Sequence, residues 1–244
     1  YDSLLTDVST KKDWNYVSSL GYAFGYLGGG LLFSINVLMY LHPQIFGIPN
    51  PETAIRISFV TVALWWIVFT IPIILFVPEP IIENSVPLRK AFREGYKQLL
   101  STFHQIKKMK VVGTFLLAYW LYIDGVDTII KMTVKMASSL GFETSDLIIA
   151  LLMVQFIAFP AAILYNFFAN KIGGKNAIFV AIAGYSLVTF LAYFMTTKLH
   201  LYLLAAIIGL FQGGIQALSR SMYAKLIPKN KETVAKIIKN FLLY

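Results

Sequence analysis

Six apolar stretches, each long enough to cross a membrane, dominate this sequence of 244 residues. A transmembrane helix needs about 20 mainly apolar residues to cross a hydrocarbon core about 30 Å thick. The stretches that meet this requirement are residues 17–41, 54–77, 111–137, 147–168, 177–195 and 201–218. This pattern predicts an all-α polytopic membrane protein with six transmembrane helices.

The composition excludes the common soluble classes. Apolar residues make up 57% of the chain and charged residues only 14%, whereas soluble domains carry about 25% charged residues. A soluble enzyme domain, a disordered tail and a nucleic-acid module are therefore excluded. The chain also contains no cysteine, which excludes disulfides, thiol nucleophiles and thiolate metal sites.

The positively charged residues divide unevenly between the two sides of the membrane that the six stretches would cross. Of the 21 Lys and Arg residues, only Arg56 and Lys198 fall on one side, and Lys131 and Lys135 lie within the third stretch. All the others fall on the opposite side. The positive-inside rule therefore predicts that both termini are cytoplasmic. The same rule explains the net charge of +9 without a nucleic-acid partner.

A basic segment, residues 89–110, separates the second stretch from the third. Apolar residues recur in it at three- and four-residue spacing among the bases. We interpret it as an amphipathic helix on the inner leaflet that connects two parts of the protein. A regulatory lipid sensor is the functional alternative.

The third stretch carries charges that are costly in lipid. At 100° per residue, Asp124, Asp127, Lys131 and Lys135 fall within an arc of about 80°, and Thr128 lies on the same stripe beside them. A charge at the bilayer centre costs at least ~2.5 kcal/mol, so this stripe should face protein or a water-filled cavity. One interpretation is a self-neutralising structural stripe with an Asp127–Lys131 pair. The other, which we favour, is a translocation pathway that binds a cation or proton at the acids and an anionic group at Lys131.

Small and polar residues mark two further stretches. Gly21, Gly25 and Gly29 have the four-residue spacing that allows close helix packing, either at a moving interface or at a static one. The last stretch combines packing glycines with a polar face, on which two glutamines followed by an arginine favour a cavity lining. These residues of the last stretch are Gly209, Gly213, Gln212, Gln216 and Arg220. Gln155, alone in its stretch, indicates a hydrogen bond between helices.

No motif predicts catalysis or a bound cofactor. The three histidines are His42, His104 and His200, and all lie outside the apolar stretches. We therefore expect no histidine relay, no metal site, no cofactor and no enzyme activity.

Three segments carry a family resemblance: Val17 to Gly30, Tyr119 to Asp127 and Gln212 to Pro228. They resemble a branch of the major facilitator superfamily, the one related to the yeast autophagy-linked vacuolar amino-acid effluxer. Val17 to Gly30 resembles its glycine-rich fifth helix, and Tyr119 to Asp127 (YWLYIDGVD) its seventh. The most specific match is Gln212 to Ser221 with Tyr223 to Pro228, at the end of the tenth helix. Residues 170–176 resemble the cytoplasmic signature loop of the superfamily but lack its usual aspartate.

The resemblance implies that the chain covers the fifth to tenth helices of a partial major-facilitator bundle. Residues 17–77 would be the last two helices of an N-terminal half, 78–110 the cytoplasmic linker, 111–232 the first four helices of a C-terminal half, and 233–244 a basic tail.

The implied function is a secondary active transporter that works by alternating access. It would move a small solute, with amino-acid efflux implied by the family, and would couple to a proton or cation. The bilayer and the solute are the expected partners, in a bacterial inner membrane or, in a eukaryote, a vacuolar or lysosomal one. A truncated non-transporting protein, an assembly partner or an oligomeric channel remain alternatives, and the oligomeric state is open.

Overall fold

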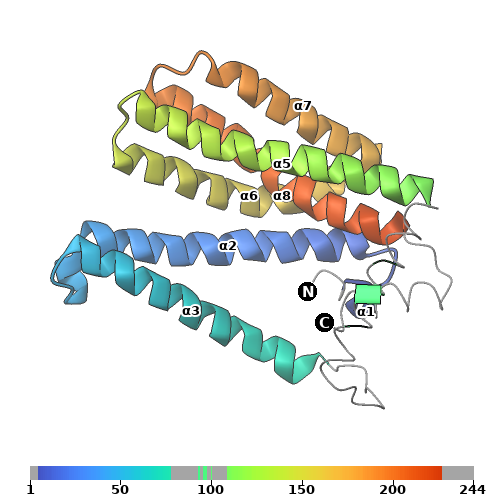
Figure 1. The fold of residues 1–244 in the computed structure, drawn as a ribbon, viewed down its shortest axis with the longest axis horizontal. Coiled ribbons are helices and arrows are strands. Elements are labelled where there is room, and N and C mark those ends of the chain that lie inside the picture. The colour runs from blue at the N-terminus through green and yellow to red at the C-terminus, as the bar shows by residue number, and fades with distance from the viewer. Residues whose placement is uncertain (1–4, 78–92, 94–95, 98–99, 101–108, 227–244) are drawn as a thin grey trace. The chain divides into compact units, whose positions relative to one another are not determined.

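The chain folds into long helices (Figure 1). The computed structural model describes residues 5–77, 93, 96–97, 100 and 109–226, and all regular structure within them is helical. The long helices are α2 (Trp14–Leu41), α3 (Pro51–Phe76), α5 (Lys110–Ser139), α6 (Thr144–Ile172), α7 (Gly174–Ala192) and α8 (Lys198–Leu226). A short helix α1 (Leu5–Val8) and a 3-10 turn η2 (Pro43–Phe46) complete the described elements. The predicted all-α class with six long helices is confirmed.

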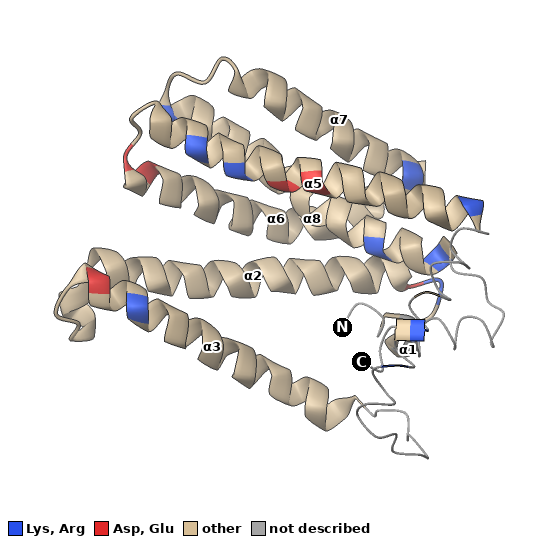
Figure 2. Ribbon diagram, viewed as in Figure 1, with Lys and Arg blue, Asp and Glu red and all other residues tan. Residues whose placement is uncertain are grey.

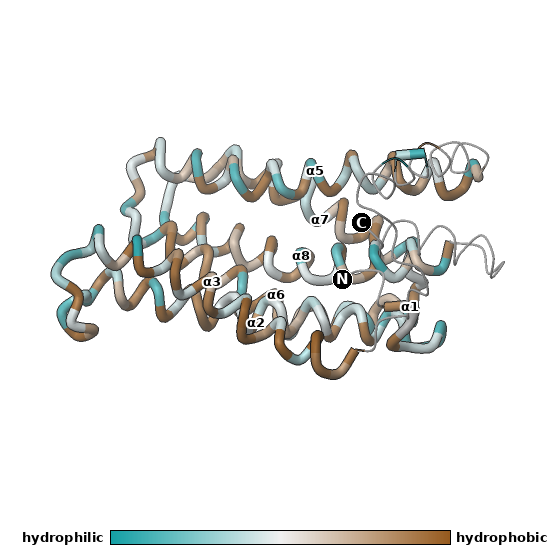
Figure 3. The backbone as a smooth tube through the Cα atoms, turned by 60° about the horizontal axis from the view of Figure 1, so that its bottom comes forward, coloured by the Kyte–Doolittle hydropathy of each residue, from teal (hydrophilic) through white to brown (hydrophobic). Residues whose placement is uncertain are grey.

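Five of the six long helices are long and apolar enough to cross a membrane: α2, α3, α6, α7 and α8. Helix α5 is also long enough, at 30 residues, but polar residues recur along it (Figure 3). The predicted end at residue 195 overshoots α7, whose backbone turns after Ala192. The predicted end at 218 falls short of α8, because polar residues continue this helix beyond the apolar run.

Local chemistry sets the helix ends. At the start of α3, the Thr53 backbone N–H donates to the side chain of Asn50 at 2.8 Å, and Pro51 occupies the first turn. Both features favour a helix start. Between α6 and α7, Gly173 has a φ of 88°, a backbone conformation that glycine adopts without a steric penalty. This residue allows α7 to begin immediately after α6 ends.

The residues group into two compact units, residues 1–27 with 88–244 and residues 28–87. In the larger unit, α8 packs against α5, α6 and α7. Its core includes Ile215, Leu218, Val188 and Tyr185, all buried. The α8 helix is therefore the central element of this unit.

The smaller unit pairs α3 with the second part of α2. The Thr61 hydroxyl donates to the Asn36 side chain at 2.9 Å, and the Trp65 ring lies in van der Waals range of the space beside Gly28. The predicted amphipathic connector lies mostly outside the described residues, and the predicted tail at 233–244 lies wholly outside them. The division into transporter halves remains a prediction.

Candidate functional site

The charged face of α5 points away from the core of its unit. Asp124, Asp127, Thr128 and Lys131 are exposed, whereas Val126 on the other side of the helix is buried. Figure 2 shows the acidic and basic residues following one another along α5, while α6 and α7 carry charge only near their ends. Lys135 lies on the same exposed face.

The structure shows no ion pair between Asp127 and Lys131 on α5, two described residues that a self-neutralising stripe would join. In the described part of the chain, the ion pairs join Lys198 to Asp146 and Glu143, and none joins Asp127 to Lys131. Asp127 instead lies within electrostatic range of Tyr26 and Tyr185. Asp127 is therefore placed to act on groups of neighbouring helices.

A cavity lies between α2, α6 and α8. Its volume is about 470 Å³, within the range of small-molecule sites, which is about 300–1,000 Å³. The residues that line it are Gly21, Tyr22, Gly25, Tyr26, Gln155, Gln216 and Arg220. All belong to the larger unit, and none is acidic.

Hydrogen bonds connect α2 to α8 beside this cavity. The Tyr26 hydroxyl donates to the Gln216 amide oxygen at 2.6 Å, and Gln212 also lies within hydrogen-bonding reach of Tyr26. About two turns earlier on α2, the Ser18 hydroxyl donates to the Ala217 carbonyl at 2.8 Å. Two of the predicted site residues, Gln212 and Gln216, are thus brought together around one tyrosine.

A second polar cluster joins the same two helices at the end of α8. The Asn15 side-chain oxygen accepts from Lys225 Nζ at 2.7 Å and also from the Ser221 hydroxyl. The Asn15 amide donates to the Asn170 side chain at 3.4 Å. This cluster links the start of α2 to the ends of both α6 and α8.

The predicted packing glycines lie in two different settings. A Cβ atom at Gly213 would lie 2.7 Å from the Ala162 Cβ and 3.0 Å from the Ala158 carbonyl oxygen. One at Gly209 would lie 3.0 Å from both the Ile157 Cβ and the Val154 carbonyl oxygen. These two glycines let α8 lie directly against α6.

The glycines of α2 face a more open environment. Gly21 and Gly25 line the cavity, and a Cβ at Gly25 would meet no atom within 4 Å. Gly29 is exposed. At Gly25 the absence of a side chain therefore leaves room rather than close helix contact.

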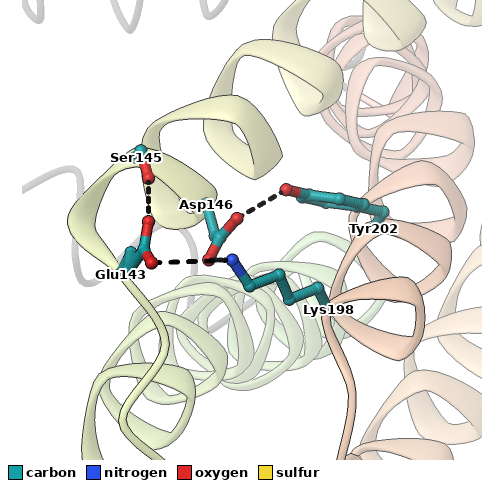
Figure 4. Close-up of polar contacts among 5 residues, drawn as sticks. All are labelled: Glu143, Ser145, Asp146, Lys198 and Tyr202. Atoms are coloured by element: carbon teal, nitrogen blue, oxygen red, sulfur yellow. Dashed lines mark hydrogen bonds and ion pairs between the residues drawn. The ribbon is translucent and has the colours of Figure 1, made fainter.

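An ion-pair cluster joins α6 and α8 at their other ends (Figure 4). Lys198 Nζ lies 2.8 Å from Asp146 Oδ2 and 4.0 Å from Glu143 Oε1, and the Tyr202 hydroxyl donates to Asp146 at 2.9 Å. The Asp146 side chain is only 7% exposed, whereas that of Lys198 is 52% exposed. A nearly buried carboxylate is stable here because an ammonium and a hydroxyl both contact it.

Several residues that line the cavity between α2, α6 and α8 were not predicted from the sequence. Tyr22 and Tyr26 were not singled out, although they follow Gly21 and Gly25 at the same four-residue spacing along one stripe of α2. Gln155 was interpreted as a packing residue but lines the cavity. The structure brings Gln216 and Arg220 to the cavity, and leaves Asp124, Thr128 and Lys131 on the exposed face of α5.

Five long apolar helices, with charges along a further long helix and a cavity with polar lining residues, are the features of an integral membrane protein. The profile of the family described as "Vacuole effluxer Atg22 like" matches residues 5–234. The chain therefore belongs to this family. Its family is one of transporters rather than of enzymes, in agreement with the expectation from the sequence.

The relatives carry matching names. The chain is 40% identical to an "Uncharacterized MFS-type transporter YxiO" of Bacillus subtilis, over 94% of this chain and 53% of that protein. It is 26% identical to "Autophagy-related protein 22" of Yarrowia lipolytica, over 89% of this chain and 41% of that protein. It is 29% identical to "Autophagy-related protein 22-1" of Penicillium rubens, over 88% of this chain and 40% of that protein.

The chain spans about half the length, or less, of these curated relatives. No solved structure matches it.

Proposed function

We propose that the chain is part of a secondary active transporter that moves a small solute, with amino acids as the first candidates, by alternating access. The observation that carries the proposal is the charged face of α5. Four ionisable residues of this helix lie on the side opposite its buried contacts. Charged residues within a membrane helix generally face a bundle interior or a water-filled path.

Each polar residue has a role in this proposal. Asp124 and Asp127 bind the coupling proton or cation, and Thr128 and Lys131 continue the path along the same face. Gln212, Gln216 and Arg220 contact the solute from α8. The termini are cytoplasmic in this scheme, since the basic residues gather on that side.

The amino-acid candidates and the efflux direction depend on the family. The family is described as a vacuole effluxer family, and one relative is named an MFS-type transporter. Fold and family together support transport but carry less information about the substrate than the site itself does.

Transport by the complete gene product in proteoliposomes tests the proposal. A panel of radiolabelled amino acids is offered with an imposed pH gradient or with an imposed sodium gradient. The variant Asp124→Asn keeps the size of the side chain but cannot ionise, so we expect at least a tenfold loss of gradient-driven accumulation with normal membrane insertion.

The matched control is Glu52→Gln, an equivalent change at the exposed start of α3, which should leave accumulation unchanged. Undiminished gradient-driven uptake by Asp124→Asn would exclude the coupling role of this residue. Absence of uptake for every solute and gradient would contradict the transport proposal itself.

A further inference from the structure

We propose that the cavity between α2, α6 and α8 binds the carboxylate group of a small solute, with Arg220 as the charged anchor and Gln216 as a second donor oriented by Tyr26. This inference rests on the proposed transport function for its biological role.

The charge of the lining favours an anion. Arg220 is the one charged residue among the residues that line the cavity, and no carboxylate is among them. A guanidinium presents five N–H donors in a planar fork that matches the two oxygens of a carboxylate. Charge-assisted bonds of this type are about twice as strong as neutral ones.

The hydrogen bond from Tyr26 sets the polarity of Gln216. Its amide oxygen accepts from the Tyr26 hydroxyl at 2.6 Å, so the amide NH₂ is the end of this side chain that remains to donate to a solute. Gln216 and Arg220 lie four residues apart on α8 and both line the cavity. The two donors therefore sit on one face of one helix, one turn apart.

The space for the solute comes from the glycines of α2. Gly21 and Gly25 line the cavity together with the α8 donors, and a Cβ at Gly25 would meet no atom within 4 Å. A side chain at Gly25 would therefore occupy space that is open in this structure. Tyr22 and Gln155 add further polar atoms to its walls.

The opposite charge lies outside the lining, on α5. Asp127 is within electrostatic range of Tyr26, so a positive group on the solute would be attracted in the direction of α5. A zwitterion with its carboxylate at Arg220 therefore fits the site better than a dianion does.

The test is binding rather than transport, measured on the purified complete gene product. Ligands that bind the folded state raise the unfolding midpoint according to their affinity. The probes are amino acids, the matched amino-acid amides, in which a neutral carboxamide replaces the carboxylate, and succinate. We expect amino acids to raise the midpoint, their amides to raise it much less, and succinate to fall between them.

Arg220→Gln is expected to weaken amino-acid affinity about tenfold to a hundredfold, because a hydrogen bond to a charged group is lost. Arg220→Lys should recover part of this loss. The matched control Lys171→Gln removes an exposed charge at the end of α6 and should leave the affinity unchanged.

Tyr26 is a positioning residue, and a double-mutant cycle separates this role from a structural one. Tyr26→Phe should weaken binding about threefold to tenfold in the wild-type background. It should have no further effect when Gln216 is already replaced by Ala. An equal effect in both backgrounds would contradict the positioning role.

Three results would overturn the site: equal binding of acids and amides, unchanged affinity in Arg220→Gln, or no binding of any carboxylate at about ten millimolar. Binding that depends on Arg220 without any transport would sustain the site and contradict the proposed function. Transport together with binding that does not depend on Arg220 would support the proposed function and contradict the site.

Discussion

Helix α8 has two neighbours that it contacts in opposite ways, α6 through glycines and α2 through polar side chains. Against α6, Gly209 and Gly213 leave no room for a single methyl group. Against α2, Ser18 and Tyr26 donate hydrogen bonds to α8, and a cavity lies beside these bonds. In lipid, where apolar surface alone drives little association, both close packing and hydrogen bonds hold helices together.

The difference indicates which interface can rearrange. Closely packed helices resist small displacements, because interiors are dense and van der Waals contacts are short-ranged. Hydrogen-bonded side chains can exchange partners with water or a solute at a modest net free energy, about 0.5–1.5 kcal/mol per neutral bond. We therefore expect α6 and α8 to move as one body, and the contacts of α8 with α2 to change during a transport cycle.

Gly213→Ala gives the largest expected effect. The new methyl group would lie 2.7 Å from the Ala162 Cβ and 3.0 Å from the Ala158 carbonyl oxygen, neither of which can rotate away. Overpacking costs about 1–3 kcal/mol, which outweighs a gain in helix propensity of at most ~1 kcal/mol. Unfolding of the purified protein in detergent should therefore show a lower free energy of unfolding.

Gly25→Ala is the matched control, since no atom lies within 4 Å of its Cβ position. It should retain or slightly raise the free energy of unfolding. If Gly213→Ala were as stable as Gly25→Ala, the contrast between the two interfaces would be wrong.

Asn15→Ala is expected to have an intermediate effect, confined to the α2 interface. It removes the acceptor for Lys225 and Ser221 and the donor to Asn170. We expect faster hydrogen–deuterium exchange in residues 14–27, because opening of this segment loses its polar contacts. Exchange along the α6–α8 interface should stay as slow as in the wild type.

Asn176→Ala provides the comparison, because its side chain donates to the Ile172 carbonyl at 2.9 Å, near the α6–α7 turn. Its exchange in residues 14–27 should match that of the wild type. Faster exchange throughout α6 and α8 in Asn15→Ala would show that the two interfaces open together.

The helices and the charged stripe of α5 could be predicted from the sequence because both are local. Apolar length specifies a membrane helix, and a rotation of 100° per residue specifies which side chains share a face. Asp124, Asp127 and Lys131 accordingly share one side of α5, and in the described part of the chain this side is exposed. Helix ends were less accurate, since polar residues such as those after residue 218 continue a helix without adding hydrophobicity.

The cavity could not be predicted because it depends on tertiary packing. Four-residue glycine spacing is the same in α2 and α8, yet a Cβ at Gly25 meets open space and one at Gly213 meets Ala162. A glutamine within a helix is equally compatible with packing and with a lining role, as Gln155 shows. The Asp146–Lys198 pair joins residues from two helices, and no local pattern connects them.

Lys198→Gln is expected to have the smallest effect. It tests how much the ion pair with Asp146 adds to the glycine packing between α6 and α8. Lys198 is half exposed, so solvent screens its attraction to Asp146. In the variant the Tyr202 hydroxyl still donates to the nearly buried Asp146 at 2.9 Å. The glutamine amide that replaces the ammonium can donate as well, so the carboxylate keeps polar contacts. We expect a small decrease in the unfolding midpoint at low salt.

Salt distinguishes this ion pair from the glycine packing beside it. The difference between the wild type and Lys198→Gln should shrink in about 1 M NaCl, where the Debye length falls to ~3 Å. The loss in Gly213→Ala should persist at the same salt concentration, because steric overlap is not screened. Lys171→Gln, which removes an exposed charge at the other end of α6, should show no loss at either concentration. A salt-independent loss in Lys198→Gln would instead show that packing of the lysine stem holds α6 and α8 together near Asp146 and Lys198. The ion pair would then contribute nothing to this contact.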